Sequence, residues 1–300
     1  MPLYLILLGI TLLYFLGFGS WMIFLSGQPD QLPHLYYSRR YSENWGLPED
    51  DPESQYVIEG QPFLYYWING AVNRTYHLLY PEENPNSEVL LWRLLSVIYS
   101  CLTVYYLYKL STKVTGNPYV GVIAAFLLSN TLMFVYLSGG VSYDNLMNLA
   151  AMASVFHLAC LFKNEDFVKH TALTGIWVVI GSLAKEQFLM LATLVFLSWT
   201  FFTVKNHRKI TLAFSWKKII LCFLLLIAIG GFITFYGTNL VRYGKTVPAC
   251  KQVKAEEFCY RYTLRRDFSE PLNLKWLWFN RDNIPNPITY AQGYWGLKMQ

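Results

Sequence analysis

The sequence predicts an all-α fold, a polytopic membrane helix bundle of about seven transmembrane helices with two polar segments on the non-cytoplasmic side. Of its 300 residues, 54% are hydrophobic and only 14% are charged, whereas soluble domains carry roughly 25% charged residues. Long uncharged apolar runs recur, and a helix of about 20 apolar residues crosses the hydrocarbon core of a bilayer. Most of the net charge of +5 sits in short loops, without a basic, aromatic-rich patch, so nucleic acid is not an expected partner.

The first apolar run covers residues 2–25 and contains no charged residue. Its length and its lack of a basic start favour a retained helix over a cleaved signal peptide. The other runs are 89–110, 118–137, 146–162, 171–184, 188–204 and 219–240. The fifth run is short and ends at Lys185 and Glu186, a charged pair that we place at the membrane interface.

Basic residues gather in the loops after the second, fourth and sixth runs. Lys109 and Lys113 follow the second run, Lys163 and Lys169 follow the fourth, and five basic residues lie between 205 and 218. The positive-inside rule then places the N-terminus in the cytoplasm. We therefore expect a multi-pass protein of the inner or plasma membrane. Residues 1–240 would form the membrane module, with an outer loop at 26–88, and residues 241–300 an outer polar segment.

Two features of the outer segments carry structural predictions. Residues 63–80 read FLYYWINGAVNRTYHLLY, a mixture of aromatic, aliphatic and polar side chains typical of a helix that lies in the membrane interface. Cys250 and Cys259 lie nine residues apart in the second outer segment. An oxidising compartment would permit a disulfide between them, although the spacing does not fix the distance between their Cα atoms.

Several short motifs follow one another at the predicted helix ends. After the first run comes PDQLPHLYY at residues 29–37, then WGLP at 45–48, EGQPFLYY at 59–66 and GVSYDN at 140–145. These stretches resemble the C-type (GT-C) glycosyltransferases, membrane enzymes that use lipid-phosphate-linked sugars. That family has an acidic residue after helix one, usually an Asp-Glu pair followed by His or Tyr, and a second Asp after helix three. RLLS at 93–96 and GSLAK at 181–185 are similar to further family motifs, and YWG at 294–296 resembles an element of bacterial multi-pass proteins of unassigned activity.

The resemblance implies transfer of a sugar from a polyprenyl-phosphate donor to a glycan, lipid or protein acceptor on the non-cytoplasmic face, with inversion. The attacking group must lose a proton, so a carboxylate base is needed, and the resemblance implies Asp30 for that role. Alternatively, Asp30 caps a short helix. Gln31 stands where the family usually has Glu, which leaves a single base and weakens any metal-binding claim. We predict no metal-binding residues, and the sequence leaves open whether a divalent cation serves as a cofactor.

The other candidate site residues each have a second interpretation. Asp144 would orient the acceptor, assist Asp30 or hold a divalent ion through oxygen ligands, or else cap its own helix. His34 matches the His or Tyr position of the family and would bind sugar or phosphate. Lys185 would bind the donor phosphate, or else reach to the interface or pair with Glu186. Arg265 and Arg266 would clamp the phosphate, or else contact lipid head groups or solvent.

Two other classes of function remain open. A multi-pass transporter is disfavoured, because the helices lack charge at their centres and no pair of broken helices recurs in two halves. A non-catalytic scaffold with the GT-C shape is kept open by Gln31. The resemblance also implies further helices after residues 241–300, so the 300 residues would be a fragment of a longer enzyme.

Overall fold

The computed structural model describes residues 2–22, 31–43, 45–49, 56–80, 85–209 and 215–254. These residues form helices and no strand, which confirms the predicted all-α class. In chain order the elements are α1 (Leu3–Met22), α2 (Gln31–Glu43), α3 (Leu64–Leu79), α4 (Pro85–Thr115), α5 (Pro118–Ser129), α6 (Leu132–Ser138), α7 (Tyr143–Phe162), α8 (Phe167–Ala184), α9 (Phe188–Asn206), a 3₁₀ turn η1 (His207–Lys209), α10 (Trp216–Tyr243) and α11 (Cys250–Val253).

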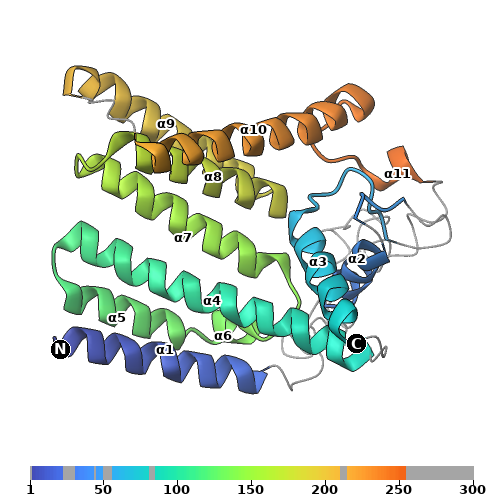
Figure 1. Cartoon of the computed structure of the whole chain (residues 1–300), viewed down its shortest axis with the longest axis horizontal. Helices are drawn as coiled ribbons and strands as arrows, with labels where there is room; N and C mark the ends of the chain where they lie inside the picture. Colours follow the sequence, from blue (N-terminus) through green and yellow to red (C-terminus); the bar gives the residue numbers. More distant parts are fainter. Residues whose placement is uncertain are drawn as a thin grey trace, which may run out of the picture.

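The long helices lie side by side, and the short helices α2, α3 and α11 gather at one end of them, on the right in Figure 1. Helix α1 packs on α4 and α5, α4 packs on α7, α7 on α8, and α8 on α10. Five helices are long and apolar enough to cross a membrane, namely α4, α7, α8, α9 and α10. Residues 3–17 of α1 are also apolar, but this stretch is shorter than the five helices named above. The architecture is a polytopic helix bundle.

The third apolar run is not the single straight helix that its sequence suggests. Residues 118–137 divide into α5 and α6, which are bent by 71° and count as a sixth span if taken together. Asn130 follows α5 and returns its side-chain amide to the Phe126 carbonyl at 2.8 Å, while Thr131 bonds the Leu127 carbonyl at 3.1 Å. Such bonds to the preceding turn offer the backbone an alternative to continuing the helix, which accounts for the break.

The predicted interfacial helix at 63–80 is present as α3, but its polar face contacts protein. Asn69 and Asn73 are buried, and the Asn69 side chain donates to Ser38 Oγ of α2 at 2.9 Å. A Cβ atom at Gly70 would come within 2.2 Å of the Tyr41 carbonyl oxygen, which belongs to backbone and does not move aside easily. Gly70 therefore permits the close approach of α2 and α3.

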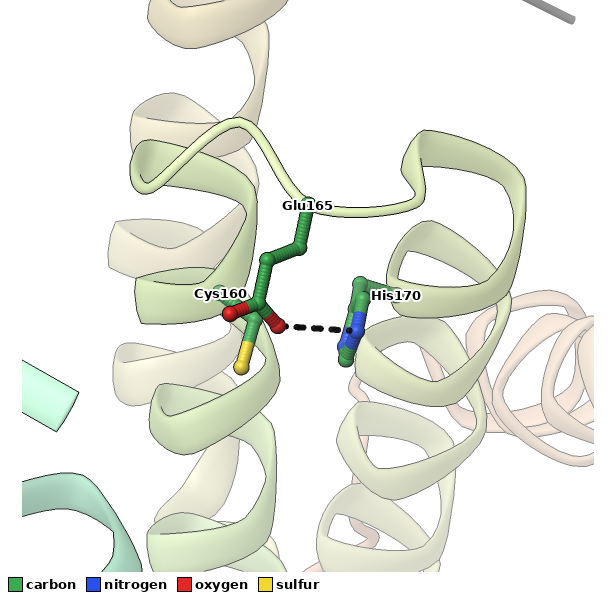
Figure 2. A group of neighbouring side chains, drawn as sticks. All are labelled: Cys160, Glu165 and His170. Carbon is green, nitrogen blue, oxygen red and sulfur yellow. Dashed lines mark ion pairs between the residues drawn. The ribbon is translucent and has the colours of Figure 1, made fainter.

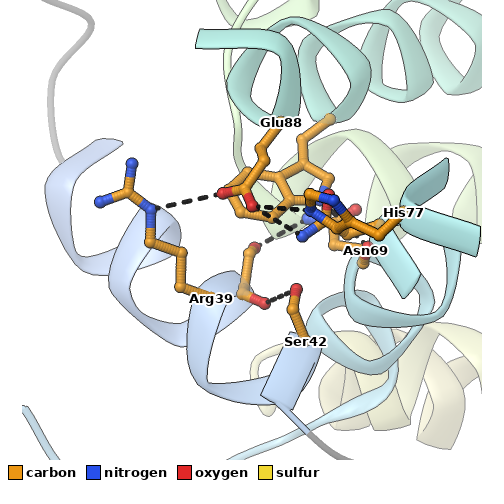
Figure 3. Close-up of polar contacts among 8 residues, drawn as sticks. Arg39, Ser42, Asn69, His77 and Glu88 are labelled. Carbon is orange, nitrogen blue, oxygen red and sulfur yellow. Dashed lines mark hydrogen bonds and ion pairs between the residues drawn. The ribbon is translucent and has the colours of Figure 1, made fainter. Parts of the chain in front are cut away.

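Glu88 of α4 contacts both α2 and α3 and holds them against the bundle (Figure 3). Glu88 accepts from Asn73 Nδ2 at 3.1 Å, lies 3.1 Å from His77 Nε2, and pairs with Arg39 at 3.7 Å. The fully buried Trp92, one turn further along α4, donates its indole N–H to the Asn69 carbonyl at 3.0 Å. These contacts fix α2 and α3 over the ends of the long helices, and α2 carries one of the predicted site residues.

Candidate functional site

The structure brings Asp144 and Lys185 into direct contact, although they lie 41 residues apart. Lys185 Nζ donates to Asp144 Oδ1 at 2.6 Å, and the two side chains are 20% and 26% exposed. Asp144 lies in the first turn of α7 and Lys185 is the residue that ends α8. An anion at a helix N-terminus and a cation at a helix C-terminus are each favoured by the helix dipole, so both helices support the pair.

This pair decides between interpretations that the sequence left open. The N-cap of α7 is Ser142, whose hydroxyl accepts from the Asp144 backbone N–H at 3.2 Å, so Asp144 is not the capping residue. Lys185 pairs with Asp144 and not with its neighbour Glu186, whose carboxylate accepts from Thr246 Oγ1 at 3.0 Å. Both side chains therefore meet at the end of the bundle where α2 and α3 lie.

His34 of α2 lies next to the pair. Its Nδ1 atom is 2.8 Å from the Tyr66 hydroxyl, and its ring meets the Tyr143 ring edge-on at 4.6 Å between centroids. Burial lowers the pKa of His34 to about 4, with smaller opposed effects from Asp144, which raises it, and Lys185, which lowers it. The imidazole is therefore neutral at pH 7 and offers one donor and one acceptor nitrogen.

Aromatic rings surround these polar groups. Lys185 Nζ lies 4.6 Å from the centroid of the Tyr143 ring, a cation–π distance. The Tyr66 ring stacks with His34, and burial raises the pKa of Tyr66 well above its ordinary value, so its hydroxyl stays protonated. Tyr37 also packs against Tyr66, with 4.9 Å between centroids. The charged pair is thus set among tyrosine rings, which limit its contact with water.

Arg93 of α4 contacts the first residue of α2, the helix that carries His34. Arg93 Nη2 donates to the side-chain carbonyl of the buried Gln31 at 3.0 Å. Gln31 is the first residue of α2 and the position at which the chain departs from the family pattern. A glutamine oxygen accepts this bond as a carboxylate would, but brings no negative charge. The bond from Arg93 to Gln31 therefore adds no negative charge at this position.

Several predicted site residues lie outside the described residues. Asp30, Arg265 and Arg266 belong to this group, as does Cys259, the expected partner of Cys250. Their roles and the disulfide stay predictions. Of the candidates that the structure describes, His34, Asp144 and Lys185 come together. Tyr66, Tyr143 and Arg93 join them without having been singled out, although all three lie inside or directly beside motifs such as GVSYDN and RLLS.

The suggestion that Asp144 holds a divalent ion fits the observed contacts poorly. Its carboxylate is already engaged by Lys185 at Oδ1 and by the Ser142 hydroxyl at Oδ2, 3.3 Å away. A hard divalent cation needs several oxygen ligands, and a lysine ammonium beside the carboxylate opposes a second positive charge. We therefore assign no step to a metal at this position.

A bundle of apolar helices with a charged, aromatic-lined site at one end is the arrangement that the resemblance to GT-C enzymes predicts. In agreement, residues 86–232 match the family described as dolichyl-phosphate-mannose-protein mannosyltransferase, which is of this type. This match confirms the resemblance inferred from the sequence motifs, and it supports a membrane glycosyltransferase of the GT-C type. The matched residues include Arg93, Asp144 and Lys185. No curated protein and no solved structure matches the chain significantly.

Proposed function

We propose that the protein transfers a sugar from a polyprenyl-phosphate donor to a glycan, lipid or protein acceptor, with inversion, on the non-cytoplasmic face of the membrane. The observation that carries the proposal is the convergence of His34, Asp144 and Lys185 at one end of the bundle. Helix α2, which holds His34 there, directly follows Asp30 in the chain. Arg93 of α4 bonds to Gln31 on the same short helix.

Lys185 is the proposed partner of the donor phosphate. A lysine ammonium has three N–H donors, and Asp144 engages one of them. A polyprenyl-phosphate sugar is a phosphodiester with one negative charge, and the departing phosphate monoester gains further charge as the bond to the sugar breaks. A fixed cation in a site partly shielded from water stabilises that developing charge more than it stabilises the bound donor.

Asp30 is the proposed base, and Asp144 the residue that positions Lys185. The Asp144 carboxylate is already engaged by Lys185 Nζ and by the Ser142 hydroxyl, which separates the two acids by role. A single base that activates the acceptor for direct attack on the anomeric carbon gives inversion, because a single displacement takes place at the far side of the carbon. His34, neutral and bonded to Tyr66, would donate to or accept from sugar hydroxyls.

The remaining assignments follow the charge pattern of the sequence. The N-terminus is placed in the cytoplasm of a cell whose inner or plasma membrane holds the protein, with residues 1–240 as the membrane module. Arg265 and Arg266, in the outer segment 241–300, are proposed to contact the donor phosphate or lipid head groups.

Asp30→Asn tests the proposal. Membranes that contain the full chain are supplied with polyprenyl-phosphate sugars labelled in the sugar, mannose first, and label that leaves the lipid donor is measured. Loss of a general base costs about 10²- to 10⁴-fold, so transfer falls at least about 100-fold. Asp166→Asn is the matched control, because Asp166 caps α8 at the other end of the bundle and asparagine caps equally well.

The outcomes separate the alternatives. Chain-dependent transfer that persists in Asp30→Asn refutes the base assignment and leaves the phosphate site to be examined alone. No chain-dependent transfer from any of the tested donors refutes the enzymatic role and favours the scaffold. The anomeric configuration of the product, read by NMR, confirms or refutes inversion.

A further inference from the structure

A second cluster of reactive side chains lies at the opposite end of α7 and α8, away from Asp144 and Lys185. Cys160 is in the last turn of α7, Glu165 is in the connecting loop, and His170 is in the first turn of α8 (Figure 2). One ligand atom from each residue lies within 4.8 Å of the other two. From Asp144 to Cys160 helix α7 rises about 24 Å, so the cluster is separate from the site described above.

The backbone of the loop is shaped to bring these three side chains together. Asn164 adopts a left-handed conformation with φ of 57°, which asparagine tolerates better than most residues. The chain then turns back, and the Glu165 N–H donates to the Cys160 carbonyl at 3.1 Å. The N-cap Asp166 starts α8 one residue later. Glu165 is therefore held over Cys160 by main-chain bonds and not only by its side chain.

The chemistry of the three donors favours one kind of ion. A thiolate, an imidazole and a carboxylate together match Zn²⁺, whereas Mg²⁺ and Ca²⁺ prefer oxygen ligands alone. Tetrahedral Zn²⁺ places its ligand atoms about 3.4 to 3.6 Å apart, from bond lengths of about 2.0 to 2.3 Å. The three ligand atoms lie within 4.8 Å of one another, and the Glu165 carboxylate is already 3.5 Å from His170 Nε2. Cys160 and His170 are buried, whereas the Glu165 side chain is 37% exposed.

His157 prepares His170 for a metal. The Nδ1 atoms of the two buried rings are 3.0 Å apart, so one of them must donate and the other accept. When His170 donates, its Nε2 atom carries the lone pair that a metal needs, which is the usual arrangement of a ligating histidine. The Nε2 atom of His170 lies 3.5 Å from Glu165 Oε2, which is too long for a good hydrogen bond. An ion bound by both atoms would hold the two side chains together.

We propose that Cys160, Glu165 and His170 bind Zn²⁺, with His157 orienting His170, and that the ion fastens the loop between α7 and α8. Binding breaks the S–H bond of Cys160 and forms a Zn–S bond, and the thiol proton leaves to solvent. The ion would reach the site from solvent past the partly exposed Glu165 carboxylate. A water molecule would be the fourth ligand. Without metal, the ion pair between Glu165 and Lys113 of α4 holds the same carboxylate.

The competing interpretation is that hydrogen bonds and ion pairs alone hold this loop, without a metal. A substitution of Lys113 distinguishes the two interpretations. Its ammonium competes with Zn²⁺ for the Glu165 carboxylate. Lys113→Gln removes that competitor, so a true site binds Zn²⁺ as tightly as before or more tightly. A clasp without metal gains no Zn²⁺ affinity from the same change.

The test uses the full chain, purified in detergent with an affinity tag that contains no histidine. Zinc is measured after desalting, and Co²⁺ is substituted to record a near-ultraviolet thiolate-to-metal band. We expect about one Zn²⁺ per chain, lost in Cys160→Ser and His170→Gln, and weakened about 10- to 100-fold in His157→Phe. Cys222→Ser and Cys101→Ser are the matched controls, since both residues are free thiols elsewhere, and both should bind as the unaltered chain does.

Zinc that Cys160→Ser retains in full is adventitious and overturns the proposal, as does the absence of bound zinc in the unaltered chain. Should Cys160→Ser fail to fold, the Co²⁺ spectrum of the unaltered chain decides alone. A thiolate band that survives in Cys101→Ser and Cys222→Ser supports the site, and a spectrum without such a band refutes it.

Discussion

The two ends of the α7–α8 pair are joined in different ways. At the site end, which carries His34, Asp144 and Lys185, an ion pair joins two residues 41 positions apart. Helices α2 and α3 pack against this end. At the far end, which carries Cys160, Glu165 and His170, the contacts join residues at most ten positions apart, across the loop between α7 and α8. The site end thus depends on the packing of distant segments, whereas the far end is specified locally. Substitutions should therefore affect activity at the site end and only local order or metal binding at the far end.

The largest expected effect follows from separating the site-end ion pair. Lys185→Met removes the proposed phosphate partner, and a hydrogen bond to a charged group is worth about 1.5–3 kcal/mol, so donor affinity should fall about 10- to 100-fold. Lys113→Met, at the far end, is the matched control and should bind the donor normally. Competition by polyprenyl phosphate measures both, and equal affinity in the two variants would contradict the assignment.

Asp144→Asn sharpens this result. If Asp144 acts through Lys185, the double variant with Lys185→Met should lose no more donor affinity than Lys185→Met alone. Additive losses would show that Asp144 acts independently of the lysine.

The next effect tests whether the site end depends on the close approach of α2 and α3. Gly70→Ala places a methyl group against the Tyr41 carbonyl, and overpacking costs about 1–3 kcal/mol. Both the thermal unfolding midpoint and activity should fall, because α2 carries His34. Gly9→Ala is the control, since nothing lies within 4 Å of its Cβ position and alanine favours a helix. Equal midpoints for the two variants would refute the packing role of Gly70.

Protonation of His34 should have a smaller effect, confined to acid. The unfolded chain binds a proton at this residue below about pH 6.5, but the folded chain binds it only below about 4. Stability from neutral His34 is therefore complete above pH 6.5 and is lost as the pH falls toward 4. Between pH 7.5 and 5.5 the loss is about 1 kcal/mol, seen as a lower unfolding midpoint in detergent. His34→Gln should flatten this dependence relative to the unaltered chain, and an unchanged slope would refute the buried, neutral state.

The smallest effect belongs to the far end without metal. Lys113→Gln breaks an ion pair whose two side chains are 31% and 37% exposed, and such pairs contribute about 0–1 kcal/mol. In the presence of a chelator the unfolding midpoint should shift by only a few degrees, and activity should be unchanged. A large loss of activity would show that the two ends are coupled through α7 and α8.

The sequence by itself determined the membrane bundle and pointed to three residues that the structure brings together. Long apolar runs can satisfy their backbone groups in a bilayer only as helices, so α1, α4, α7, α8, α9 and α10 follow from composition and length. Helix α3 was also predicted, and so were His34, Asp144 and Lys185 as site residues. The break between α5 and α6 was missed, because hydropathy does not register the bonds that Asn130 and Thr131 return to the preceding turn.

Only the tertiary structure decided which charges meet. Lys185 stands beside Glu186 in the chain, yet it pairs with Asp144, because antiparallel packing brings the end of α8 to the start of α7. The same packing sets Tyr66 on His34 and Arg93 on Gln31. Distances of a few ångströms between side chains distant in sequence depend on how helices are stacked, and the order of residues along one chain does not contain that information in readable form.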